Sequence, residues 1–234
     1  MAKRGEIVTV YAAGLIQGVA LVTFPAASAV FTSPGNYGLS NTEYGGMFVP
    51  QALLAIVSSL LGAGLRKRLG TKRIYLLGLS ANLLAMVLLV VSRFVMHEHS
   101  LAYGTLLVAT ASMGIGFGFT VPALNTFAAA FFQNKVDRAV LALNALLGLG
   151  TALAPVFIAL FVGLGIWWAL PVLIGALILG LLLVSASQTL GAGGTTHAIH
   201  ARKSNVKTNT GHARGTPIKN NNASGIGLVR IWPK

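Results

Sequence analysis

Residues 166–187 read IWWALPVLIGALILGLLLVSAS, a run of 22 residues without one ionisable side chain. An α-helix needs about 20 mostly apolar residues to cross the ~30 Å hydrocarbon core of a bilayer. The run meets this length, and it is unbroken rather than alternating. Strands of membrane barrels are shorter and alternate between apolar and polar residues. The stretch therefore predicts a transmembrane helix.

Five stretches before this one have the same character. The six predicted spans cover residues 7–31, 44–65, 74–96, 101–132, 139–163 and 166–187. Over the whole chain of 234 residues, 55% are hydrophobic and only 9% are charged, whereas about a quarter of a soluble domain is charged. The sequence predicts an all-α integral membrane protein with six transmembrane helices.

The basic residues gather in alternate connections of this bundle. Lys3 and Arg4 precede the first span, residues 66–73 hold five basic residues, and two more lie between spans four and five, whereas Arg93 is alone in the opposite connections. By the positive-inside rule, both termini face the cytoplasm. The net charge of +13 then reflects topology and anionic lipid head groups rather than nucleic-acid binding. We expect a multi-pass protein of the plasma (or inner) membrane.

Composition changes abruptly near Ser187. Residues 188–234 are rich in Gly, Thr, Asn, Lys and His and poor in apolar residues, so they cannot bury enough surface to fold alone. We expect a basic, disordered cytoplasmic tail.

Two short segments suggest an internal repeat. Thr23-Phe24-Pro25-Ala26 in the first span resembles Thr120-Val121-Pro122-Ala123 in the fourth, 97 residues later. The same offset carries the second span onto the fifth and the third onto the sixth. Because each repeat has three spans, the second is inverted in the membrane. Inverted three-helix repeats are typical of secondary transporters.

Three prolines lie inside predicted spans, and each removes a backbone hydrogen bond. They are Pro25, Pro122 and Pro155. Such prolines either kink a helix for packing or free a carbonyl beside a solute path. Both alternatives stay open for these helix kinks.

Polar residues form stripes on four of the spans. The stripes contain Gln17, Gln51, Asn125 and Asn144 on spans one, two, four and five, which predicts that these four helices form the inner set and that spans three and six face lipid. We assign the four amides to the solute path. For Gln51 and Asn144, hydrogen bonding between helices is the alternative. No Asp, Glu, Lys, Arg or His lies at mid-membrane, so no proton-coupling carboxylate is predicted.

The connection between spans two and three, residues 63–73 (AGLRKRLGTKR), resembles the signature loop of the major facilitator superfamily, Gly-x-Leu-Ala-Asp-Arg-x-Gly-Arg-Lys. Residues that match are Leu65, Arg68, Gly70 and Lys72. Departures are Ala63, Lys67 in place of the aspartate, and Thr71. Asp137 and Arg138 resemble the family's entry to the fifth helix, and residues 148–155 its Gly-rich stretch ending in proline.

The resemblance implies the six-helix N-terminal half of such a transporter, built from two inverted three-helix repeats. It also implies an inner gate formed by Leu65, Arg68, Gly70, Lys72, Asp137 and Arg138, although Lys67 removes the acid that takes part in the family's lock. Spans one, two and four look closer to the sugar-permease branch (fucose or glucose type) than to drug exporters.

The expected function is transport of a small organic solute, with or without a coupling ion, by alternating access. A second six-helix half, from another copy or a separate chain, is needed as partner. The alternative is a truncated product of such a gene without transport activity, which the change near Ser187 suggests. The spans hold no paired carboxylates, no nucleophile–base arrangement and no metal-ligand spacing, so neither an enzyme nor a cofactor is expected, and the absence of cysteine excludes disulfides.

Overall fold

The computed structural model describes residues 3–188, which form helices and no strand. The elements are α1 (Arg4–Ala26), α2 (Ser28–Thr32), α3 (Asn41–Gly46), α4 (Phe48–Leu69), α5 (Thr71–Ser92), the 3₁₀ helix η1 (Arg93–Val95), α6 (His99–Phe131), α7 (Val136–Gly163) and α8 (Ala169–Ser187). Six stretches of these residues are long and apolar enough to cross a membrane. The prediction of an all-α protein with six spanning helices is therefore confirmed for this part of the chain. Of the predicted tail, only Gln188 lies among the described residues.

Two of the six candidate spans consist of a short and a long helix. The first joins α1 to α2 (Arg4–Thr32), and the second joins α3 to α4 (Asn41–Leu69). Glycines with positive φ mark two of the turns between spans. Gly70 has φ 85° between α4 and α5, and Gly165 has φ 72° between α7 and α8. Since L residues with a side chain rarely adopt this conformation, the tight turn at Gly70 depends on glycine.

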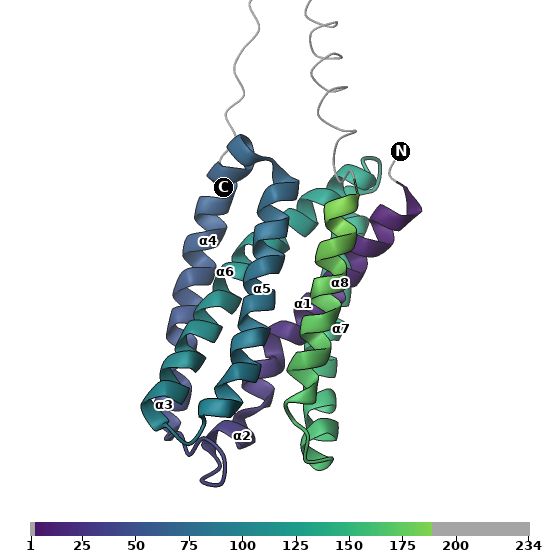
Figure 1. Ribbon diagram of the computed structural model, residues 1–234. Coiled ribbons are helices and arrows are strands. Elements are labelled where there is room, and N and C mark those ends of the chain that lie inside the picture. The colour runs from purple at the N-terminus through teal and green to yellow at the C-terminus, as the bar shows by residue number, and fades with distance from the viewer. Residues whose placement is uncertain (1–2, 189–234) are drawn as a thin grey trace, which may run out of the picture. The chain divides into compact units, whose positions relative to one another are not determined.

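The helices run alternately up and down, so that connections cluster at two ends (Figure 1). One end, here called the basic end, holds the start of α1, the α4–α5 and α6–α7 turns and the end of α8. The opposite end holds α2, α3, η1 and the α7–α8 turn. Helix α1 packs chiefly on α7, and α4 packs chiefly on α6. In the predicted repeats α1 corresponds to α6, and α4 corresponds to α7. The α1–α7 pair therefore corresponds to the α6–α4 pair.

Glycines bring both helix pairs into backbone contact. A Cβ added to Gly18 of α1 would lie 2.0 Å from the carbonyl oxygen of Leu147, and one added to Gly150 of α7 would lie 2.1 Å from that of Leu15. In the other pair, a Cβ on Gly114 of α6 would lie 2.2 Å from the carbonyl oxygen of Gln51. Small residues are how membrane helices pack closely when no hydrophobic effect drives them together.

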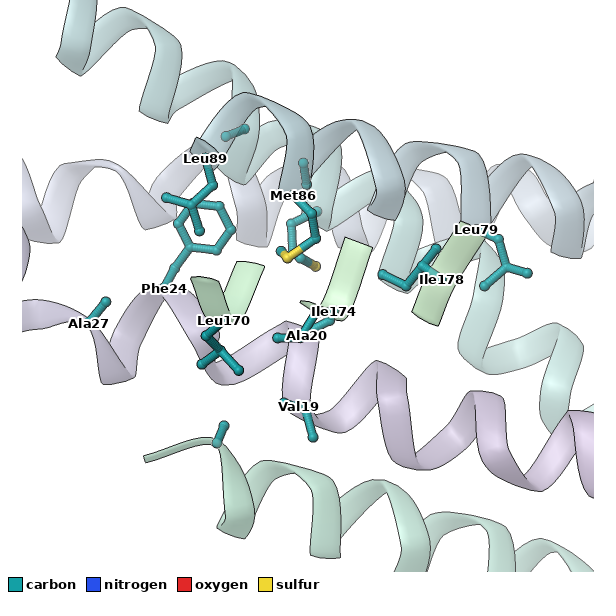
Figure 2. Close-up of a cluster of buried hydrophobic side chains, with 14 of the residues drawn as sticks. Val19, Ala20, Phe24, Ala27, Leu79, Met86, Leu89, Leu170, Ile174 and Ile178 are labelled. Carbon is teal, nitrogen blue, oxygen red and sulfur yellow. The ribbon is translucent and has the colours of Figure 1, made fainter. Parts of the chain in front are cut away.

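An apolar core fills the space between α1, α5 and α8 (Figure 2). The side chains that meet there are Ala20 and Phe24 from α1, Leu79, Met86 and Leu89 from α5, and Leu170, Ile174 and Ile178 from α8. All of them are almost fully buried. Dispersion contacts of this kind hold membrane helices together.

The burial of the spans within the bundle differs, and the expected division into inner and lipid-facing helices stays a prediction. Helices α4 and α7 are the least buried spans, with exposed side chains such as Leu53, Leu60, Leu141 and Leu160, whereas α5 is well buried. Gln51, Ala55 and Ser58 of α4 pack against glycines of α6. The other faces of α4 and α7 remain uncovered by the described residues.

Candidate solute site and gate residues

The Gln17 side chain lies inside the bundle, paired with an amide that the sequence analysis did not assign. Asn82 of α5 donates from Nδ2 to Oε1 of Gln17 (2.5 Å) and to Oγ1 of Thr120 on α6 (3.4 Å). The exposed fraction is 2% for Gln17 and 0% for Asn82 and Thr120. We call these three residues the central amide cluster. Within the described residues, Nε2 of Gln17 and Oδ1 of Asn82 have no hydrogen-bond partner.

Two glycines make room for this cluster. A Cβ on Gly116 would lie 2.0 Å from Oδ1 of Asn82, and one on Gly78 would lie 2.4 Å from Oγ1 of Thr120. Each polar side chain therefore rests on a glycine of the facing helix, which lets α5 and α6 approach closely. The available sequence signal was that Asn82 stands almost alone as a polar residue in the third span.

A hollow of about 250 Å³ lies between α1, α4 and α6, and one predicted solute-path residue lines it. That residue is Gln51, whose Oε1 is buried without a hydrogen-bond partner among the described residues. The other lining residues are Leu21, Phe48, Ala52, Ala55 and Phe117. Gln17 is one helical turn from Leu21 on α1, which puts the central amide cluster at a neighbouring level of the bundle.

An aromatic cluster at the opposite end adjoins the hollow. The ring of Tyr44 lies edge to face with that of Phe48 at 5.2 Å and donates its hydroxyl to the carbonyl oxygen of Pro25 (3.1 Å). Phe31 links Tyr44 to Tyr37. Burial raises the pKa of Tyr37 to about 12, so its hydroxyl stays protonated and bonds Ser92 at 2.7 Å. The hollow is thus bounded by packed rings on this side.

Asn125 and Asn144 form a separate bridge between α6 and α7. Nδ2 of Asn144 donates to Oδ1 of Asn125 (3.1 Å) and to the carbonyl oxygen of Val140 (2.8 Å). Asn144 is exposed and Asn125 half-buried. Neither residue lines the hollow. The four predicted path residues therefore occupy three places: the central amide cluster, the hollow and this bridge.

The three prolines that were predicted to lie inside spans differ in their place within the helices. Pro25 lies one residue before the end of α1, whereas Pro122 and Pro155 lie inside unbroken helices. Because proline has no N–H, Pro122 removes the usual intrahelical donor to the carbonyl of Gly118. Ser59 of α4 donates to that carbonyl instead (3.3 Å). A packing contact between helices thus compensates this proline.

The predicted gate residues lie at the basic end. Leu65 is half-buried and Arg68 exposed near the end of α4, Gly70 forms the turn, and Asp137 and Arg138 are exposed in the first turn of α7. The carboxylate of Asp137 is favourable in the first turn of α7, because the amino-terminal end of a helix attracts negative charge. No ion pair joins the α4–α5 loop to Asp137 within the described residues.

Lys72 makes contacts that the sequence analysis did not predict. Its Nζ donates to the carbonyl oxygens of Ala186 (2.8 Å) and Gln188 (2.5 Å) at the end of α8. Gln188 in turn donates from Nε2 to Oγ1 of Thr9 on α1 (3.2 Å). A cation at the carboxyl end of a helix satisfies free carbonyls and complements the helix dipole. Lys72 therefore ties α5 to α8, and Gln188 ties α8 to α1.

Replacing Lys72 by methionine should lower the melting temperature of the purified chain, because the stem still packs but the carbonyls of α8 lose their donor. Loss of a charge-assisted contact of this kind costs about 0.3–1 kcal/mol at a partly exposed site. Lys72→Arg, which keeps the charge, should lose less. Equal melting temperatures for wild type and Lys72→Met, measured by thermal unfolding in one detergent, would contradict the capping role.

Comparison with known families gives one finding. A family model described as Major Facilitator Superfamily matches residues 10–190, a range that contains most of α1 and every later helix. No curated protein and no solved structure matches the chain.

Proposed function

Because the chain belongs to the major facilitator superfamily, whose members are membrane transporters, we propose that it moves a small organic solute across a membrane by alternating access. In this mechanism a bundle rocks against a second bundle around a site between them. The uncovered apolar faces of α4 and α7 support the need for a second six-helix half, supplied by another copy or a separate chain.

The observation that carries the proposal is the hollow between α1, α4 and α6. It combines a small volume with one amide residue, Gln51, among apolar and aromatic lining residues. Ligand sites are mostly apolar hollows with a few well-placed polar groups. In this proposal the basic end is the inner gate, and the ring cluster of Tyr37, Tyr44 and Phe48 borders the site at the other end. The resemblance to sugar permeases makes sugars the first solutes to test.

Uptake into liposomes that contain the purified chain tests the proposal. We expect saturable uptake of at least one small solute, and a dimer or a complex with a second six-helix protein in detergent. A panel covering sugars, amino acids, amines and organic acids, each run with and without a proton or sodium gradient, would also identify a coupling ion. Absence of uptake for the entire panel, together with a strictly monomeric chain, would overturn the proposal.

Orientation can be tested with single cysteines because the chain has none of its own. Gly64 near the basic end and Gly163 at the other end both have open space for an added side chain. If the basic end faces the cytoplasm, a membrane-impermeant maleimide should label Gly163→Cys in intact cells. Gly64→Cys should be labelled only after the cells are opened. The reverse pattern would contradict the proposed topology.

A further inference from the structure

Arg93 contacts the indole ring of Trp168 at the opposite end of the bundle. Its guanidinium carbon lies 4.8 Å from the centre of that ring, which is the geometry of a cation–π contact. Arg93 begins η1 directly after α5, and Trp168 directly precedes α8. Helices α5 and α8 pack side by side (Figure 1). The contact therefore links the two helices at the end of the bundle that carries few basic residues.

A packed layer beneath this contact fixes both of its partners. Trp167, the neighbour of Trp168, is buried and meets the ring of Tyr37 edge to face at 6.0 Å. The hydroxyl of Tyr37 forms a hydrogen bond of 2.7 Å with that of Ser92, the residue before Arg93. The residues that flank the cation and the indole are thus tied to each other through Tyr37.

The charge of Arg93 has no counter-charge among residues 3–188. The ion pair found in this part of the chain joins His99 to Glu43, and Glu98, the other acid at this end, does not pair with Arg93. The guanidinium also donates no hydrogen bond to another of these residues. Because a planar guanidinium can stack on a ring while its N–H groups donate in the plane, its donors remain free for an acceptor from outside.

Apolar side chains surround this cation on the lipid side. Phe94, which directly follows the arginine, is 79% exposed. Trp168 begins an exposed apolar stripe on α8, because the same side of the helix continues with Val172, Leu179 and Leu183. Tryptophan and arginine at the end of a span lie at the level of the lipid head groups. The free donors therefore lie beside lipid rather than in an aqueous loop.

We infer that Arg93 and Trp168 bind the head group of an anionic phospholipid in the leaflet at the opposite end of the bundle. The guanidinium donates to the phosphate oxygens in charge-assisted hydrogen bonds, and one acyl chain follows the exposed stripe of α8. A choline or ethanolamine head group brings its own cation to the phosphate, which competes with Arg93, whereas a glycerol head group does not. The inference is independent of the proposed transport function.

Quenching of tryptophan fluorescence by brominated lipids tests the inference, because Trp168 belongs to the proposed site. Trp232 is replaced by phenylalanine, so that Trp167 and Trp168 are the remaining indoles. The full chain is reconstituted into phosphatidylcholine vesicles in which a fixed fraction of the lipid is brominated phosphatidylglycerol or brominated phosphatidylcholine. We expect the phosphatidylglycerol to bind about fivefold more tightly, the factor for one basic residue at an anionic membrane surface.

Two substitutions of the cation separate its charge from its shape. Arg93→Gln, which removes the charge, should abolish the preference, so that both brominated lipids quench equally. Arg93→Lys keeps the charge without the planar fork and should keep part of the preference. The matched control is Arg73→Gln, because Arg73 is exposed at the other end of the same helix. This control should show the preference of the wild type, and melting temperatures of all variants separate lost lipid binding from lost folding.

Glycerol 3-phosphate, added at constant ionic strength, distinguishes a lipid from a soluble phosphate. If it removes the preference, the site takes a soluble anion and the inference is overturned. Equal quenching by both lipids in the wild type, or an unchanged preference in Arg93→Gln, would also overturn it. Loss of the preference in Arg73→Gln would show a general attraction of anionic lipid to a basic protein, which contradicts a site at Arg93. None of these measurements involves transport, so the proposed function stands or fails separately.

Discussion

Replacing Gly150 by alanine is expected to destabilise the bundle by about 1–3 kcal/mol, the range for overpacking a well-packed interior. The added methyl group would lie 2.1 Å from the carbonyl oxygen of Leu15 and 2.9 Å from the backbone nitrogen of Val19. Both atoms belong to the backbone of α1, so no side-chain rotation can relieve the clash. Helices α1 and α7 would have to move apart along one of the main contacts between helices.

The chain offers a control two residues away in the same helix. Gly148 of α7 has nothing within 4 Å of an added Cβ, and alanine favours a helix over glycine by about 0.8–1 kcal/mol. Gly148→Ala should therefore be neutral or slightly stabilising. Thermal unfolding of both variants in one detergent, followed by fluorescence-detected size exclusion, gives the comparison. Similar midpoints for the two alanine variants would refute the close α1–α7 contact.

The number and type of helices could be predicted from the sequence because lipid leaves the backbone few alternatives. An apolar run of sufficient length must satisfy its hydrogen bonds internally, so residues 166–187 could hardly be anything but a helix. The contact of Gly18 and Gly150 between α1 and α7 was not predicted. A helix that is apolar on all sides carries no pattern that fixes its rotation, so the sequence does not show which neighbour such a glycine faces.

The positions of the polar residues depend on that rotation. The sequence left hydrogen bonding between helices open for Gln51 and not for Gln17, yet Gln17 pairs with Asn82 inside the bundle and Gln51 lines the hollow. Lys72 matched a gate motif, yet its ammonium group caps α8, because α5 and α8 pack with the start of α5 beside the end of α8. Hydrogen-bond partners that lie 65 or more residues apart in the chain are set by how the helices pack. A single sequence does not show this packing.

Replacing Asn82 by leucine is expected to be the most damaging polar-to-apolar change in the bundle. Gln17 would then lose the donor to its Oε1 while its Nε2 already lacks a partner, leaving a buried amide wholly unpaired. Such a loss costs about 1–3 kcal/mol. Replacing Gln17 by methionine alone, which has a similar shape, should also destabilise the bundle, because Nδ2 of Asn82 would keep only its longer hydrogen bond, to Oγ1 of Thr120.

The double variant Gln17→Met/Asn82→Leu should be nearer to wild type than the sum of the single variants, because removing both partners leaves no orphaned group on either side chain. Hydrogen bonds between membrane helices average about 0.6 kcal/mol and reach about 1.7, so we expect a coupling energy near the upper value for this fully buried pair. Thermal or denaturant unfolding of wild type, the two single variants and the double variant measures this coupling energy.

The control pairs Gln17→Met with Asn144→Leu, because the exposed amide of Asn144 bridges α6 and α7 elsewhere. The effects of these two substitutions should be strictly additive. A coupling energy of zero for Gln17 and Asn82 would show that their hydrogen bond adds nothing to stability, and that the glycine contacts at Gly78 and Gly116 alone hold α5 against α6.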